Sequence, residues 1–201
     1  MKKLLFLFAI VFALTACSAS KEKKAEALIK DSIQKVLIFP DSYDPIEMQL
    51  DSAFSPQHDP SFIQLCLDFN EKGLEYESLQ DDIVMAEREK SLYNPSLSAY
   101  FRTRHQQAIE KYDSLIQKNE QLTGQLKKMG EEFSAQSTKE PEFIGYFAHQ
   151  SYRAKNNAGD TLMGEKYFLF DKDVSSILYV WDKEEIELYD AFLTQLANLE
   201  E

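Results

Sequence analysis

The chain has 201 residues and carries 34 aspartates and glutamates against 22 lysines and arginines, a net charge of −12. This excess of negative charge repels the phosphate backbone of nucleic acids, which argues against nucleic-acid binding. It also repels anionic lipid surfaces, so membrane attachment through a basic patch is not expected. The length suits one domain, or one domain with an insertion.

The first residues have the pattern of an export signal that ends in a lipidation site. Lys2 and Lys3 precede an unbroken apolar run over residues 4–14. That run is far shorter than the roughly 20 residues that a membrane-spanning helix needs, and it fits the apolar centre of a signal peptide. The tetrapeptide Leu14-Thr15-Ala16-Cys17 follows it and resembles the bacterial lipobox.

The lipobox resemblance implies cleavage after residue 16 and attachment of fatty acyl chains, such as palmitate, to Cys17. Two or three such chains anchor a protein stably in a membrane. Ser18 stands where an aspartate would favour the inner membrane, so we expect the outer membrane, on either its periplasmic or its exterior side. Residues 17–24 then form a lipidated tether. The alternative is an ordinary signal peptide that happens to contain a cysteine.

Two elements are expected before residue 57. Apolar residues at helical spacing predict a helix over residues 23–38, which Pro40 ends. Strict alternation of apolar and polar residues over 46–54 predicts a strand with one buried face. Pro56 and Pro60 mark the end of this segment.

Residues 61–133 carry a different pattern. Apolar side chains recur every seven residues from Phe62 to Ile83 and again from Ala108 to Met129, with Asn119 as a polar exception. Tyr93-Asn94-Pro95 interrupts the two series. The pattern predicts two antiparallel helices, each roughly 45–55 Å long, in a hairpin inserted at residues 57–139.

Three strands and a helix are expected in the remainder, over residues 143–155, 161–170 and 176–181 and from Asp182 onward. Asp182 is the expected N-cap, with Glu185 as its capping-box partner. The predicted fold class is therefore α+β, with an antiparallel sheet of about four strands and flanking helices on one face. Residues 25–56 and 140–201 form this domain, and the hairpin interrupts it.

Three stretches of this sheet domain are similar to small uncharacterised lipoproteins of the Bacteroides group. They are FPDSYDP (residues 39–45), YFAHQSYRAKNNAG (146–159) and YFLFD (167–171). The resemblance covers the lipobox and roughly 95 residues of the α+β part, but not the hairpin. It implies a cystatin-like or nuclear transport factor 2-like domain, and it carries no active site.

One candidate ligand site lies in the strand and turn that contain His149, Arg153, Lys155 and Asn156. Alternation places the first three side chains on one face of the strand, where they could receive a carboxylate or sulfate. The alternative is local: Asn157 and Gly159 supply the positive φ angles of a hairpin turn, and Arg153 pairs with Glu165.

A second candidate site is the hairpin tip, where Tyr93, Tyr100 and Phe101 would present aromatic rings to a protein partner. Alternatively, these rings pack on one another and close the tip. Cys66 has an apolar sequence context and is expected to be a buried, unreactive thiol. The segment from Asp171 to Ser175 faintly resembles a calcium loop, but a plain turn explains it better.

The function hypotheses follow from location and shape, because no catalytic, cofactor-binding or metal-binding motif is present. The favoured one is a non-catalytic binding or assembly lipoprotein of the cell envelope. It would be attached to the membrane through acyl chains on Cys17 and would use the hairpin to reach a protein partner. A small-ligand carrier that uses the sheet face is the alternative, and a carboxylate-based hydrolase is a weaker one. We expect no enzyme activity and no cofactor.

Overall fold

The computed structural model describes residues 21–199, so the expected signal peptide, Cys17 and the start of the tether lie outside the described residues. The chain divides into two compact units. Of the described residues, 21–63 and 140–199 form one unit, which we call the sheet unit. The other, Gln64–Lys139, is the hairpin unit.

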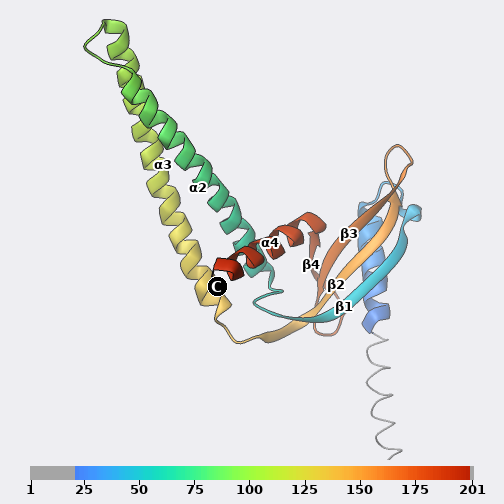
Figure 1. Cartoon of the computed structure of the whole chain (residues 1–201). Coiled ribbons are helices and arrows are strands. Elements are labelled where there is room, and N and C mark those ends of the chain that lie inside the picture. Colours follow the sequence, from blue (N-terminus) through green and yellow to red (C-terminus); the bar gives the residue numbers. More distant parts are fainter. Residues whose placement is uncertain (1–20, 200–201) are drawn as a thin grey trace, which may run out of the picture. The chain divides into compact units, whose positions relative to one another are not determined.

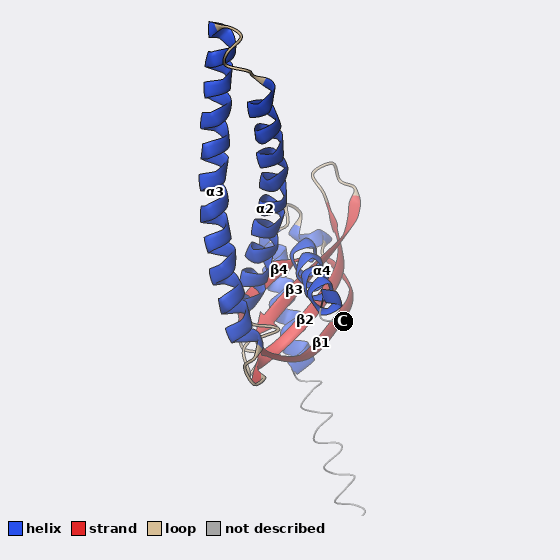
Figure 2. Cartoon of the chain, turned by 60° about the vertical axis from the view of Figure 1, so that its left-hand side comes forward, coloured by secondary structure: helices blue, strands red, loops and turns tan. Residues whose placement is uncertain are grey.

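Four antiparallel strands form the centre of the sheet unit: β1 (Asp44–Ser55), β2 (Glu142–Lys155), β3 (Thr161–Phe170) and β4 (Ile177–Asp182). They lie in the order β1-β2-β3-β4, so each pairs with its neighbour along the sheet (Figure 1). Together with the helices this arrangement confirms the predicted α+β class (Figure 2).

The first face of the sheet packs against the helix over residues 21–36, which we call the N-terminal helix. Ala25, Ile29 and Ile33 recur at helical spacing on its buried side. They meet alternate residues of β2 and β3, among them Phe168 and Phe170, which are fully buried. Each of these large side chains contributes roughly 1.5–3 kcal/mol through burial. The 3-10 helix Pro40–Ser42 then leads the chain into β1.

The opposite face of the sheet is covered by α4 (Lys183–Leu199), whose Ile186, Tyr189 and Phe192 are buried. The expectation that the helices share one face is therefore wrong. The physical reason is that the second face is also apolar: it includes Leu169 and Trp181, which are almost fully buried. An apolar sheet face exposed to water would be unstable, so each face requires a cover.

The start of α4 follows the predicted capping box in part. The backbone N–H of Asp182 donates to the Glu185 carboxylate at 2.8 Å. The carboxylate of Asp182 instead contacts Lys166 on β3, because β4 extends through Asp182 and places it directly opposite that lysine.

The hairpin unit consists of α2 (Pro60–Leu92), except for its first turn, and α3 (Ala99–Ser137). Leu79, Ala86, Ala108 and Leu122 are buried along the seam. Asn119, the polar exception in the apolar stripe, accepts a hydrogen bond from Gln80 at 2.7 Å across the helix pair. Such a polar pair specifies the register of two helices. Among residues 21–199, no helix combines the length and the apolar character that crossing a membrane requires.

Ion pairs between the two helices run in the antiparallel sense. Lys118 contacts Glu75 at 2.9 Å, and Lys111 contacts Glu89 at 3.0 Å. Hydrogen bonds from Lys72 and Lys118 lower the pKa of Glu75 to about 2. These groups are solvent-accessible, so the pairs orient the helices more than they stabilise them.

Gly145 on β2 provides a test of how closely β2 approaches the end of β3. Its φ is +154°, and a Cβ atom there would lie 1.9 Å from the carbonyl oxygen of Phe170. Gly145→Ala should lower the free energy of unfolding of the sheet unit by about 2–4 kcal/mol, because backbone would have to move. Denaturant unfolding followed by fluorescence of Trp181, the single tryptophan, measures this change.

Gly124→Ala is the matched control, because nothing lies within 4 Å of a Cβ at that position of α3. Helix propensity predicts that this change stabilises the hairpin by about 1 kcal/mol, as measured by circular dichroism. A Gly145→Ala variant as stable as the wild type would contradict the close approach.

Candidate functional site

His149 on β2 belongs to a polar cluster on the α4 side of the sheet. Its ring stacks on Tyr167 with centroids 4.6 Å apart, and its Nε2 lies 3.1 Å from a Glu165 carboxylate oxygen. The other oxygen of Glu165 accepts from the Lys183 ammonium at 2.8 Å. The Lys183 hydrogen bond is the main reason why the pKa of Glu165 lies below its ordinary value. His149 is thus engaged within the fold by one carboxylate and one ring.

Arg153 and Lys155 lie further along the same face of β2 and do not join the His149 cluster. They line a shallow hollow of about 430 Å³ that Asp41, Ser42 and Asp44 also line. Arg153 contacts Asp44 at 3.7 Å, and the backbone N–H of Lys155 donates to the Ser42 hydroxyl. Because carboxylates share the hollow, it has no net positive charge with which to attract an anion.

The expected Arg153–Glu165 pair is wrong. The β2–β3 register places Met163 opposite Arg153 and Ser151 opposite Glu165. Glu165 therefore contacts His149, two residues before Ser151 on β2. Arg153 contacts Asp44 at the start of β1. Sequence spacing alone does not establish such a register, because a shift by two residues preserves the same faces.

Asn156 is a turn residue in this structure. Its side-chain oxygen accepts from the backbone N–H groups of Ala158 and Asp160, both at 2.9 Å. Gly159 has the expected positive φ of +88°, but Asn157 does not, since Val174 is the only non-glycine residue with positive φ in the described part of the chain. The Asn156 side chain is occupied by the turn that it closes.

The segment from Asp171 to Ser176 is also a turn. The Asp171 carboxylate accepts from the backbone N–H of Ser175 and from the hydroxyls of Ser175 and Ser176. These hydrogen bonds place the pKa of Asp171 well below its ordinary value. Within residues 21–199, no cluster of three or more potential ligand side chains is placed to hold a metal ion. Cys66 is fully buried, and burial raises the pKa of its thiol to about 12.

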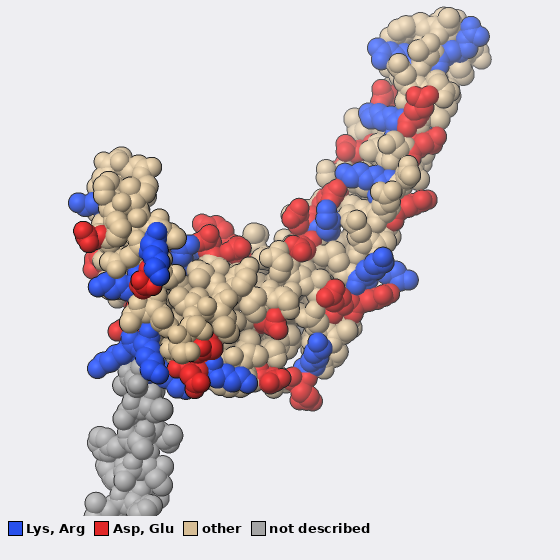
Figure 3. Space-filling model, turned by 180° about the vertical axis from the view of Figure 1, so that it is seen from behind, with Lys and Arg blue, Asp and Glu red and all other residues tan. Residues whose placement is uncertain are grey.

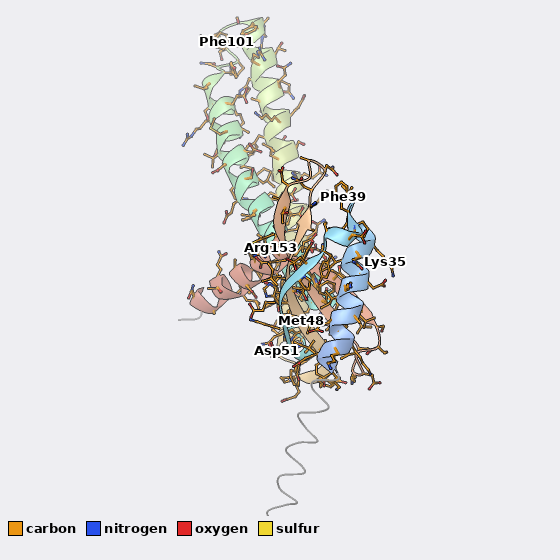
Figure 4. The ribbon with its side chains drawn as sticks, turned by 90° about the vertical axis from the view of Figure 1, so that its right-hand side faces the viewer. Lys35, Phe39, Met48, Asp51, Phe101 and Arg153 are labelled. Carbon is orange, nitrogen blue, oxygen red and sulfur yellow. The ribbon has the colours of Figure 1, made fainter. Side chains whose placement is uncertain are left out.

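Two hollows adjoin the covered faces of the sheet. One, about 280 Å³, lies between α4 and the sheet and has Phe147, Tyr167 and Tyr189 among its walls. The other, about 660 Å³, runs between the N-terminal helix and β1. Figure 4 shows Met48, which lines this groove, on β1 beside that helix. The sequence carries no signal for this groove, because alternation predicts a strand but not whether the strand lies at the edge of a sheet.

The hairpin tip, residues 90–109, combines both interpretations made from the sequence. The rings of Tyr93, Tyr100 and Phe101 do pack on one another, with centroids of neighbouring rings about 6 Å apart. Tyr100 nevertheless stays 61 % exposed. Arg104 lies over its ring, and the Arg104 Nε donates to the Tyr100 hydroxyl at 3.2 Å.

The tip is also apolar and basic. Leu92 and Leu97 are 74 % and 68 % exposed, and both belong to the tip together with the exposed Tyr100. The tip contains three lysines and arginines, Lys90, Arg102 and Arg104, and no aspartate or glutamate. Figure 3 shows basic side chains gathered at this end of the hairpin. In a protein with a net charge of −12, this end therefore offers an apolar surface with positive charge.

The Glu165 carboxylate gives a testable pH dependence. Its pKa in the folded protein lies below its ordinary value, so its ion pair stabilises the fold above about pH 4.5 and is lost as the pH falls further. Glu165→Gln should reduce the free energy of unfolding by less than about 1 kcal/mol near pH 6. The difference from the wild type should shrink as the pH falls below about 4.5, because the carboxylate is then protonated progressively. Trp181 fluorescence in denaturant at several pH values measures it.

Glu77→Gln, at an exposed position of α2, is the control and should show no such change. If the difference between Glu165→Gln and the wild type were constant from pH 3 to pH 7, the ion pair would not contribute to stability in this way.

Comparisons with known proteins do not assign these sites. No protein family, no curated protein and no solved structure gives a match to this chain. The similarity to small lipoproteins of the Bacteroides group therefore stays a prediction.

Proposed function

We propose that this protein is a lipid-anchored, non-catalytic binding module of the bacterial cell envelope. Acyl chains on Cys17 hold it at the outer membrane, and the hairpin tip contacts a protein partner. The observation that carries the proposal is the surface of the tip, where exposed apolar side chains stand next to basic ones. Residues 90–109 contain no aspartate or glutamate, and Glu89 just outside them pairs with Lys111.

The chemistry of the tip suits recognition of a protein. Tyrosine and arginine are the residue types that most often dominate binding energy at protein interfaces. The Tyr100 ring already contacts Phe101 and Arg104 within the chain, and these contacts restrict its rotation. A side chain that is already ordered loses little entropy when a partner covers it. The expected partner surface is apolar at its centre and acidic at its rim.

The length of the two helices supports the same function. They have 33 and 39 residues, which corresponds to roughly 50 and 60 Å. The core of the sheet unit is formed by the strands, the N-terminal helix, α4 and the first turn of α2, whereas the hairpin unit is compact by itself. A hairpin of this length that ends in an apolar, basic surface is suited to contact with a second molecule.

Carriage of a small ligand is the second candidate function. The hollow between α4 and the sheet, about 280 Å³, would be its site. Pockets for small ligands usually measure roughly 300–1,000 Å³, so this hollow is at the lower limit and supports that function less well.

Site-specific photo-crosslinking tests the tip. A benzoylphenylalanine at position 97, introduced into the full chain in its native host, should give a discrete adduct with one envelope protein. Adding Tyr100→Ala should reduce this adduct by about tenfold, because truncation of an interface tyrosine commonly costs 2 kcal/mol or more.

Position 85 on the shaft of α2 is the matched control, because Met85 is also 61 % exposed but lies away from the tip. A crosslinker at position 85 should give no such adduct. Equal adducts from both positions, or adducts with lipid alone, would contradict partner recognition by the tip.

Metabolic labelling tests the anchor. The wild type should incorporate an alkyne analogue of palmitate, and Cys17→Ser should not, because acylation requires the thiol of that residue. Cys66→Ser removes the other cysteine and should label like the wild type. Mass spectrometry of the amino terminus should find acyl groups on Cys17, and an unmodified terminus in the native host would refute the anchor.

A further inference from the structure

The outer edge of β1 is an open edge of the sheet. β1 pairs with β2 on one side, and in the described part of the chain no strand pairs with its other side. An edge strand directs alternate backbone N–H and C=O groups away from the sheet, where a further strand can bind them. β1 is 12 residues long, whereas β4 at the opposite edge has only six.

The central part of β1 lacks three of the features that commonly protect an edge. Residues 47–53 pair with β2 without interruption, and the irregularities lie before Glu47 and after Ala53. Lysine, proline and bulges are the common devices against additional strands. Residues 47–53 contain no lysine and no proline. This stretch is thus regular and presents seven residues to a possible further strand.

The N-terminal helix provides a second wall beside this edge. The groove of about 660 Å³ between them is lined on the helix by Lys23, Glu26, Ala27 and Lys30 and on the strand by residues that include Met48. These helix positions lie one turn apart, so they form one face of the helix. The helix side of the groove carries charges of both signs, so it has little preference for a ligand of either charge. Ala27 and Met48 favour small aliphatic side chains.

The face of β1 opposite to Met48 is negatively charged. Glu47, Gln49 and Asp51 alternate on the sheet face opposite to Met48, and all three are exposed. Glu47 lies at the margin of the groove and also lines it. Directly opposed side chains on neighbouring strands attract each other when their charges differ and repel when they agree. An added strand with basic residues at alternate positions would therefore match Glu47 and Asp51.

Pairing with a second copy of this chain is disfavoured by the same charges. If two β1 strands paired antiparallel about Gln49, Glu47 of each copy would lie opposite Asp51 of the other. Like charges in directly opposite positions are destabilising. The acidic residues of β1 thus select against self-association and for a basic segment.

We propose that β1 binds an extended segment of a partner protein, in which basic and small aliphatic residues alternate, as a fifth strand in the groove beside the N-terminal helix. Backbone hydrogen bonds to β1 supply the affinity, and alternate side chains supply the specificity. The basic residues lie against Glu47 and Asp51, and the aliphatic ones enter the groove. This site is separate from the hairpin tip and does not depend on the proposed function.

Peptide binding to the full chain in a non-ionic detergent tests this proposal. The probe is a fluorescent octapeptide of alternating lysine and valine, followed by anisotropy. The peptide in which glutamate replaces lysine should bind at least about tenfold more weakly. Only one of the two alternate sets of peptide N–H groups can face β1, so N-methylation of one set should abolish binding and N-methylation of the other should not.

Charge reversal on the protein completes the test. The double variant Glu47→Lys and Asp51→Lys should weaken binding of the lysine peptide by about tenfold and strengthen binding of the glutamate peptide. The double variant Asp81→Lys and Asp82→Lys, at exposed positions of α2, has the same net charge and should bind like the wild type. Circular dichroism confirms that both variants are folded.

Three outcomes would overturn the proposal. Equal affinity for both peptides would show that alternate basic residues are not recognised. Equal loss of binding for both sets of N-methylated peptides, or no loss for either, would exclude strand addition. A dimer of the full chain in light scattering that the double variant at Glu47 and Asp51 alters would show that a second copy occupies the edge.

Discussion

The pairing of β1 with β2 is the constraint on which the rest of this structure depends. These strands are neighbours in the sheet, yet the whole hairpin separates them in the chain, and the pairing ends with Ser55 opposite Glu142. Closing so long a connection costs conformational entropy if the connection is flexible. A helical hairpin folds its own ends together, so the insertion lowers this cost, and the sheet remains a simple antiparallel meander.

The two faces of the sheet are covered by helices, whereas its two edges carry unpaired backbone groups. Both faces are apolar, and the N-terminal helix and α4 cover one each. Helices that pack on the two faces leave the two edges of an open, four-stranded sheet unpaired. Of the two edge strands, β1 is longer than β4. The hydrophobic effect thus accounts for the layers, whereas unpaired backbone groups remain where the sheet ends. A binding site at such an edge needs no change in the core.

Charge is distributed unevenly over the elements of this acidic chain. The part of β1 that is open to an added strand has Glu47 and Asp51, and the hairpin tip has lysine and arginine without any carboxylate. Surface ion pairs contribute little stability, so such segregation has little effect on the fold. It has a larger effect on which partners can approach, because charge complementarity controls encounter and register.

The sequence by itself determined the periodic features of this protein: four strands, a long hairpin with its seam, and a closing helix after Asp182. These depend on local spacing, which one chain segment carries alone. Only the tertiary structure decided that helices cover both faces, that Glu165 contacts His149 and Lys183 while Arg153 contacts Asp44, and that β1 has an open edge beside a groove. The physical reason is that strand order and register depend on contacts between residues far apart in the chain, and alternation along one strand is compatible with several registers.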